Sequence, residues 1–389
     1  MSATVENVDQ PGKPSPAITT ATLISGAIGL AVGLALAYPV FFEGGRALAQ
    51  GTNMAWGLPV ATYAFLALGS FGLSMVAAVG GVFGLSGWNR ITPRLYMLAL
   101  AVSFGAIAAL AMELGHPIRA IWAIPLNMQI QSPLLWMGVF WGVYVVCLLA
   151  MMLRLRRVDA LERGSRRLAV VILLTCLGAL FTQGLVYGMM SMRPVWYGIG
   201  TPLYYMYGAI LTGVALALLF INLTHGFSQD NMVAAKRRVM RDQLPVIFLV
   251  ALVGYAIVVS AKIITGLWAP TTGVQVVYEH MVGTGLFWFE VLGGVLLPIA
   301  LMAAPAMRTR PAVQGVAAVL AVVGLFIARY EFTVSGQQVP LFKGSWVPGL
   351  VEYSPNIVEW GILVTGAFLA LTVYAVADRF FNTGPYSAD

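Results

Sequence analysis

Long apolar stretches separated by short polar segments run along almost the whole chain. A helix needs ~20 mostly apolar residues to cross a bilayer, because its backbone polar groups must be satisfied inside the hydrocarbon. Ten stretches meet this requirement, at 18–42, 58–83, 95–114, 134–153, 168–190, 202–224, 244–265, 283–304, 312–330 and 358–377. The pattern predicts an all-α polytopic membrane protein, with a transmembrane domain over 18–380 between short tails at 1–17 and 381–389.

The composition and the placement of charges support this prediction. Hydrophobic residues make up 59% of the chain and charged residues 10%, against about 25% charged in soluble domains. If the N-terminus is cytoplasmic, sixteen of the 22 Lys and Arg residues fall on the cytoplasmic side, as the positive-inside rule requires. We therefore expect both termini to be cytoplasmic. The net charge of +7 then reflects membrane anchoring, and no nucleic-acid partner is expected.

The first candidate site follows the third span. Glu113 and His116 are three residues apart, so they share one helix face. Pro117 should end or kink the helix there. A carboxylate beside an imidazole can accept and deliver protons near neutral pH. In the alternative interpretation, Arg119 pairs with Glu113 in a helix-end cluster.

Further ionisable residues occur within or beside later spans, where they are costly and by default suggest function. Glu290 lies about 12 Å into the eighth span at 1.5 Å per residue, where a proton relay or a structural hydrogen bond would explain it. Glu359 follows Ser354 and Pro355 and could serve a helix start instead. Lys262 lies near a span end and should extend its amine to the surface. Arg329 and Glu331 leave the ninth span, before a long loop predicted at 331–357.

Metal and haem ligands are scarce. Cys147 and Cys176 lie inside apolar spans, without metal-ligand spacing. Of the three histidines, His116 and His280 are both near the non-cytoplasmic side, which leaves a bis-histidine haem conceivable. Haem-binding bundles usually carry axial histidines well inside their helices. We expect no metal, haem or iron–sulfur cluster in this chain.

Several motifs together resemble the polysulfide reductase/NrfD family of membrane subunits, in its longer ten-span branch. The motifs are Trp56-Gly-Leu-Pro-Val-Ala-Thr-Tyr63, Glu113-Leu-Gly-His-Pro-Ile-Arg119, Arg193-Pro-Val-Trp196, Arg329 with Gly336-Gln337, and Tyr353-Ser-Pro355 with Glu359. No single motif is very specific, but their order and their placement at the non-cytoplasmic face are shared. The longer branch includes hydrogenase-type, sulfur-oxidation-type and alternative complex III-type subunits.

The resemblance implies a quinone- or quinol-reactive anchor, built around two four-helix bundles, in a respiratory complex of the bacterial inner membrane. It implies an iron–sulfur ferredoxin-like partner and a further catalytic or cytochrome subunit on the periplasmic face. Many members have Asp-Leu-Gly-Arg-Pro at the first site, so the role of His116 is inferred from chemistry alone.

Combining chemistry and resemblance, we assign three roles. Catalysis falls to His116 and Glu113, quinone binding to Arg119, Trp122, Gln337 and Tyr353, and proton transfer to Glu290 and Glu359. Two other functions remain open. A proton-coupled secondary transporter also fits ten helices with an intramembrane carboxylate, although no internal repeat is evident. A redox-inactive membrane scaffold is the second alternative.

Overall fold

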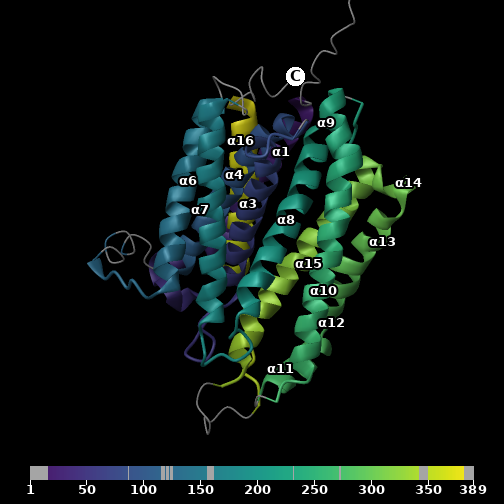
Figure 1. Cartoon of the computed structure of the whole chain (residues 1–389). Coiled ribbons are helices and arrows are strands. Elements are labelled where there is room, and N and C mark those ends of the chain that lie inside the picture. Colours follow the sequence, from purple (N-terminus) through teal and green to yellow (C-terminus); the bar gives the residue numbers. More distant parts are fainter. Residues whose placement is uncertain are drawn as a thin grey trace, which may run out of the picture.

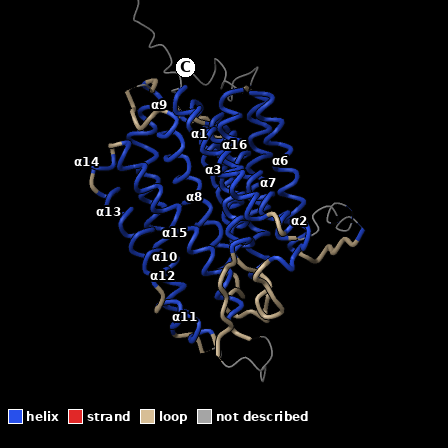
Figure 2. Tube along the Cα trace, turned by 180° about the vertical axis from the view of Figure 1, so that it is seen from behind, coloured by secondary structure: helices blue, strands red, loops and turns tan. Residues whose placement is uncertain are grey.

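A computed structural model describes residues 16–85, 87–114, 119, 122, 126–155, 162–230, 232–270, 273–340 and 349–380. These residues form helices and loops, and no strand occurs among them (Figure 2). Ten of the helical segments are long and apolar enough to cross a membrane. The predicted all-α, ten-span fold class is therefore confirmed.

Ten segments of the described residues cross the molecule, and short elements lie between them. The crossing segments are α1 (Pro16–Ala37), α3 (Leu58–Gly81), α4 (Thr92–Glu113), α6 (Pro133–Leu155), α7 (Arg163–Gly188), α8 (Gly200–Thr224), α9–η3–α10 (Ala234–Arg238, Val239–Gln243, Leu244–Leu267), α12–η4–α13 (Gly285–Trp288, Phe289–Leu296, Leu297–Ala303), α15 (Pro311–Gln338) and α16 (Ile357–Phe380). The short elements are α2 (Val40–Glu43), η1 (Gly44–Ala47), η2 (Trp88–Arg90), α11 (Val274–Val282) and α14 (Pro305–Arg308).

The crossing segments form two four-helix bundles side by side (Figure 1). In the first bundle α3, α4, α6 and α7 contact one another in a ring, and in the second α8, α10, α12–α13 and α15 do so. The bundles meet where α8 packs against α3 and α7. We call the side that carries the start of α1 and the end of α16 the terminal face. The other side, where α3 begins and α4 ends, is the opposite face.

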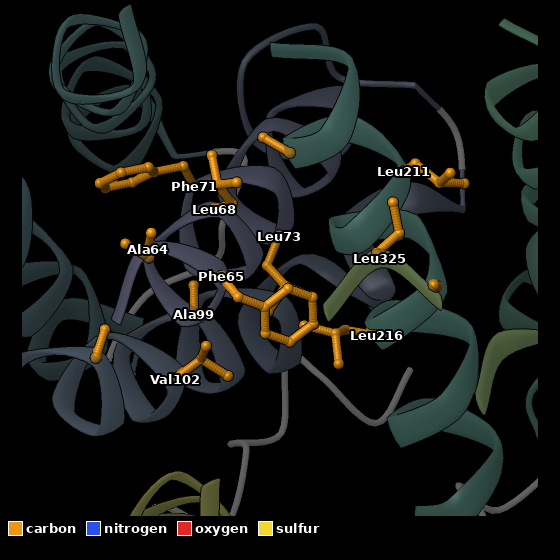
Figure 3. Packing of buried hydrophobic residues seen from close by; sticks show 14 of the residues in the cluster. Ala64, Phe65, Leu68, Phe71, Leu73, Ala99, Val102, Leu211, Leu216 and Leu325 are labelled. Carbon is orange, nitrogen blue, oxygen red and sulfur yellow. The ribbon is translucent and has the colours of Figure 1, made fainter. Parts of the chain in front are cut away.

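Glycines allow the closest helix contacts. Gly26, Gly29 and Gly33 of α1 lie directly against α16, where an added Cβ would overlap its residues. At the contact between the bundles, Gly72 of α3 meets the backbone of Gly213 of α8. Apolar side chains of α3, α4 and α8 fill the interior around this contact (Figure 3). Van der Waals contact between close backbones holds helices together where lipid supplies little hydrophobic drive.

Two crossing segments contain a π-helical stretch, and each stretch stops just before a proline. Val239–Gln243 precedes Leu244 and Pro245, and Phe289–Leu296 precedes Leu297 and Pro298. Proline lacks an N–H and clashes with the carbonyl four residues earlier, so a wider turn before it relieves the clash. Such stretches often occur at functional sites. The second one carries Glu290.

Some predicted boundaries were wrong. The ninth span continues to Gln338, so five polar residues assigned to the loop at 331–357 lie in helix α15: Glu331, Thr333, Ser335, Gln337 and Gln338. The first span ends at Ala37, because Pro39 interrupts it before α2. The seventh begins at Ala234, ten residues before the predicted start at 244. The division into tails and one domain stays a prediction, since 1–15 and 381–389 lie outside the described residues.

Candidate functional site

The opposite face contains a cluster of aromatic rings between the two bundles, which we call the aromatic cluster. Tyr187 of α7 is its centre, with ring centroids 5.2 Å from Trp56, 5.1 Å from Trp196, 5.4 Å from Tyr205 and 5.4 Å from Phe332. These contacts bring together the Trp56 and Trp196 motifs with helices α7, α8 and α15. The motifs that are far apart in sequence therefore meet at one place.

Arg329 is buried beside this cluster, nine residues before the end of α15. Its guanidinium carbon lies 4.0 Å from the ring centroid of Tyr204 and 4.5 Å from that of Tyr205. It also donates to the Tyr204 carbonyl at 3.4 Å. Gly208 leaves the space for it, because a Cβ there would overlap the guanidinium. Cation–π contact with two rings partly replaces the water that this charge has lost.

Two carboxyl groups from different segments lie beside this arginine. Glu290 of η4 and Glu331 of α15 are in side-chain contact with each other. Glu331 Oε2 is buried without a hydrogen-bond partner among the described residues. Thr284 donates to Glu331 Oε1 at 3.1 Å. Two buried carboxyl groups from different segments therefore lie next to each other.

Lys262 of α10 completes what we call the charged cluster: Lys262, Glu290, Arg329 and Glu331. Its amine lies 4.5 Å from the Tyr204 ring centroid and 4.4 Å from that of Phe332, and it interacts electrostatically with both carboxyl groups. The expectation that Lys262 extends to the membrane surface is wrong. The aromatic rings and the carboxyl pair draw its amine inward.

A groove of about 520 Å³ reaches Lys262 from the side of the molecule. Its walls come from α8 and α10, and α11, the 194–197 loop and Phe332 close its ends. Most of the lining is apolar. The groove therefore connects the lipid-facing side of the second bundle with the charged cluster.

Glu113 lies at the end of α4, half-buried, and interacts electrostatically with Tyr63 and Tyr187. The structure thus places this carboxyl at the first-bundle edge of the aromatic cluster. His116 lies outside the described residues. Arg119 and Trp122 are exposed, with the guanidinium carbon 6.0 Å from the Trp122 ring centroid.

Gln337 joins the loop before α3 to the end of α15. Its Oε1 accepts from the Trp56 N–H at 2.9 Å, and its Nε2 donates to the Trp56 carbonyl at 2.6 Å and to Thr333 at 3.0 Å. Arg193 donates to the carbonyls of Gln337 and Val339 and so caps the same helix end. The whole side-chain amide of Gln337 is therefore used to hold the backbone around Trp56.

Tyr353 and Glu359 form a second link to α3. The Tyr353 hydroxyl accepts from the Leu58 N–H at 2.7 Å and donates to Glu359 Oε2 at 3.0 Å. Burial raises the pKa of Tyr353, so the phenol keeps its proton. Glu359 also accepts from the Asn356 N–H, while Asn356 Oδ1 accepts from the Glu359 N–H. This reciprocal arrangement is a capping box at the start of α16, as the helix-start interpretation of Glu359 predicted.

The terminal face has a polar network of its own, which the sequence did not reveal. Arg94 of α4 forms a buried ion pair with Asp378 of α16 at 2.9 Å and donates to the Tyr374 hydroxyl at 2.9 Å. The Tyr374 hydroxyl shares a hydrogen bond with Thr224 at the end of α8. The ion pair joins α4 to α16 inside an apolar bundle, and the Tyr374 hydroxyl links both helices to α8.

His225 adjoins this network just beyond α8. Its Nδ1 lies 2.9 Å from the Ile221 carbonyl, and its Nε2 lies 3.2 Å from the Lys236 amine. Burial, with the nearby charges of Lys236 and Arg94, lowers the pKa of His225 to about 3. The imidazole is thus neutral at ordinary pH, with Nδ1 donating to the carbonyl and Nε2 accepting from the amine.

No group of three His, Cys, Asp or Glu side chains that could hold a metal ion occurs among the described residues. The absence of haem and of iron–sulfur clusters from the whole chain stays a prediction.

The fold and the site define a multi-pass membrane protein that holds interacting ionisable groups inside its helix bundles. Residues 47–340 match the family model described as polysulphide reductase, NrfD. The chain therefore belongs to the NrfD family, as the motifs suggested.

Three relatives cover most of the chain. It is 24% identical to the menaquinone reductase integral membrane subunit of Nitratidesulfovibrio vulgaris, over 82% of this chain and 83% of that one. It is 21% identical to a selenate reductase subunit of Mesobacillus selenatarsenatis (89% and 90%). It is 20% identical to the Hdr-like menaquinol oxidoreductase integral membrane subunit of Archaeoglobus fulgidus (86% of each). Family and relatives together support a quinone-interacting membrane subunit.

Proposed function

We propose that this chain is the quinone- or quinol-reactive membrane subunit of a multisubunit respiratory oxidoreductase. One observation carries the proposal. A row of ionisable and aromatic side chains runs inside the membrane domain from Glu113, through Tyr187 and Tyr205, to Arg329 and the charged cluster. Quinone chemistry needs such a combination of apolar surface, hydrogen-bonding groups and proton carriers.

The quinone ring site lies near Glu113 and His116 in this proposal. Oxidation of a quinol releases two electrons and two protons, and reduction takes up the same numbers. His116 and Glu113 bind one ring oxygen and exchange its proton. Arg119 and Trp122 bind the ring, while Gln337 and Tyr353 fix the loops around it. The contacts of Gln337 and Tyr353 with Trp56 and Leu58 support this positioning role.

The electrons pass to or from an iron–sulfur ferredoxin-like partner subunit in the same complex, which is joined by a catalytic or cytochrome subunit. We place these partners on the periplasmic side of a bacterial inner membrane, with both termini of this chain in the cytoplasm. The distribution of Lys and Arg supports this orientation. The opposite face, with its loops and aromatic cluster, is then the periplasmic one.

Proton transfer extends the proposal inward. Glu290 contacts Glu331 and interacts with Lys262, so a proton can move among these groups. Glu359 receives hydrogen bonds from Tyr353 and Asn356 and would exchange protons with the ring site through the phenol. Movement of protons across the membrane would require a further path from the charged cluster to the terminal face.

The test is quinone-dependent electron transfer by the purified complex in lipid nanodiscs. The Glu113→Gln and His116→Ala variants should lose this activity and still copurify with the iron–sulfur partner. Wild-type turnover by both variants would contradict the site assignment. Purification of the wild-type chain without redox partners would instead favour a transporter. If the complex assembles but its electron transfer is insensitive to quinone-site inhibitors, this chain is better explained as a redox-inactive scaffold.

A further inference from the structure

The groove between α8 and α10 has a specific shape. Leu203, Tyr207 and Ile257 stand at its side and are 53%, 43% and 65% exposed, so it opens towards the lipid. Tyr204, Lys262 and Phe332 form its inner end. A space of about 520 Å³ falls within the usual range for small-ligand sites.

The inner end offers one strong hydrogen-bond donor in an apolar setting. The Lys262 amine lies against the rings of Tyr204 and Phe332, five residues before the end of α10. At 1.5 Å per residue this is about 8 Å inside the helix end. A ligand here meets two aromatic surfaces and an ammonium group together.

The charge balance favours a neutral ligand. Lys262 and Arg329 are cations, and the Glu290–Glu331 pair interacts with both of them. The two carboxyl groups match the two basic groups in number, which leaves little net attraction for a phosphate. A flat apolar ring that carries an uncharged hydrogen-bond acceptor can be bound by the Lys262 amine and the aromatic rings alone. A long apolar tail would leave through the lipid-facing side.

We propose that the groove between α8 and α10 is a binding site for the headgroup of a membrane quinone. Lys262 donates to one ring oxygen, Tyr204 and Phe332 contact the ring, and the apolar tail lies along α8 and α10. The carboxyl pair holds the Lys262 amine in place. This inference rests on the proposed function, and it places a quinone at the second-bundle end of the row that begins at Glu113.

The first experiment measures the binding of heptyl-hydroxyquinoline N-oxide, a fluorescent quinone analogue, to the purified complex in nanodiscs. Lys262→Met should weaken binding in the groove about 10- to 150-fold, because a hydrogen bond to a charged group contributes about 1.5–3 kcal/mol. Ala261→Trp, which fills the groove, should remove one binding site from the titration and leave the site at Glu113. The matched variants Lys236→Met, at the terminal face, and Val250→Trp, on the lipid-facing side of α10, should bind as the wild type does.

The second experiment needs no variant. An azidoquinone photolabel on the wild-type complex should mark peptides of α8 and α10, and excess unlabelled quinone should prevent the labelling. If excess phosphatidylglycerol prevents it and quinone does not, the groove holds a phospholipid and the inference is wrong.

The outcomes separate the inference from the proposed function. If Lys262→Met and Ala261→Trp bind the analogue normally and Glu113→Gln does not, the ring site lies at Glu113 and the groove assignment fails alone. If the wild-type complex neither binds the analogue nor exchanges electrons with a quinone, the proposed function fails first. Labelling of α4 peptides alone would also overturn the groove assignment.

Discussion

Replacing Gln337 with Leu tests how the opposite face is organised. Leu has a similar volume but removes both hydrogen bonds to the Trp56 backbone, which are 2.9 Å and 2.6 Å long. A net contribution of about 0.5–1.5 kcal/mol for each bond gives about 1–3 kcal/mol for the pair. The segment around Trp56 should therefore open more often, and its amide should exchange hydrogen about 5- to 150-fold faster.

Hydrogen exchange followed by mass spectrometry on the complex in nanodiscs measures this directly. Gln314 provides a matched control at the far end of the same helix. Its side chain bonds Asn222 at 2.9 Å and the carbonyls of Met240 and Arg308 at 3.1 and 2.8 Å. Gln314→Leu should quicken exchange at the terminal face and leave the Trp56 segment as in the wild type.

Two results would refute the reasoning. The first is unchanged exchange at Trp56 in Gln337→Leu, and the second is equal acceleration in both variants. If Gln337→Leu lost binding of the quinone analogue while exchange at Trp56 stayed normal, Gln337 would touch the quinone directly. The positioning role would then be replaced by the direct contact that the sequence suggested.

Three further predictions concern packing and the terminal face. Arg94→Met leaves Asp378 as an unpaired buried charge, so the unfolding free energy, measured by denaturation in detergent, should fall by about 3–5 kcal/mol. Adding Asp378→Asn should restore part of this free energy. Gly213→Leu places a side chain in the backbone of Gly72 and should prevent recovery of folded protein in size-exclusion chromatography, whereas Gly213→Ala should be milder. His225 is neutral in the fold, with its pKa lowered to about 3, while the unfolded chain binds a proton below about pH 6.5. Stability should therefore fall as pH drops from about 6.5 towards 3, by at most about 1.4 kcal/mol per pH unit, and His225→Gln should flatten this part of the melting-temperature profile; an equally steep profile would contradict the assignment.

The fold could be predicted from the sequence because a bilayer restricts it so strongly. Apolar length alone identified ten spans, since each must satisfy its backbone within itself. The boundaries were harder. The ninth span was ended at 330 because Arg329 and Glu331 are charged, yet both charges are compensated inside the protein and α15 continues to Gln338. Hydropathy measures the cost of a charge in lipid and takes no account of partners on other helices.

The candidate site was predicted in part. The motifs at Trp56, Trp196 and Gln337 were identified in sequence and meet in the structure. The charged cluster was not foreseen as a unit, since Lys262 and Glu290 are 28 positions apart and no local pattern links them. A signal was nevertheless present in Pro298, which marks the end of the π-helical stretch that carries Glu290. The ion pair of Arg94 and Asp378 gave no such signal.

The charged cluster is hard to explain as packing alone. Burying Arg329 and two carboxyl groups costs several kcal/mol for each ion, and apolar side chains of similar volume are often as stable or more so. The interior of this protein is already apolar, and glycine contacts such as Gly294 against Gly324 bring η4 and α15 together without any charge. Joining these helices therefore does not require Glu290 and Glu331. A role that needs protons or a donor inside the membrane accounts for their presence, and the quinone that we propose for the groove leading to Lys262 fits such a role.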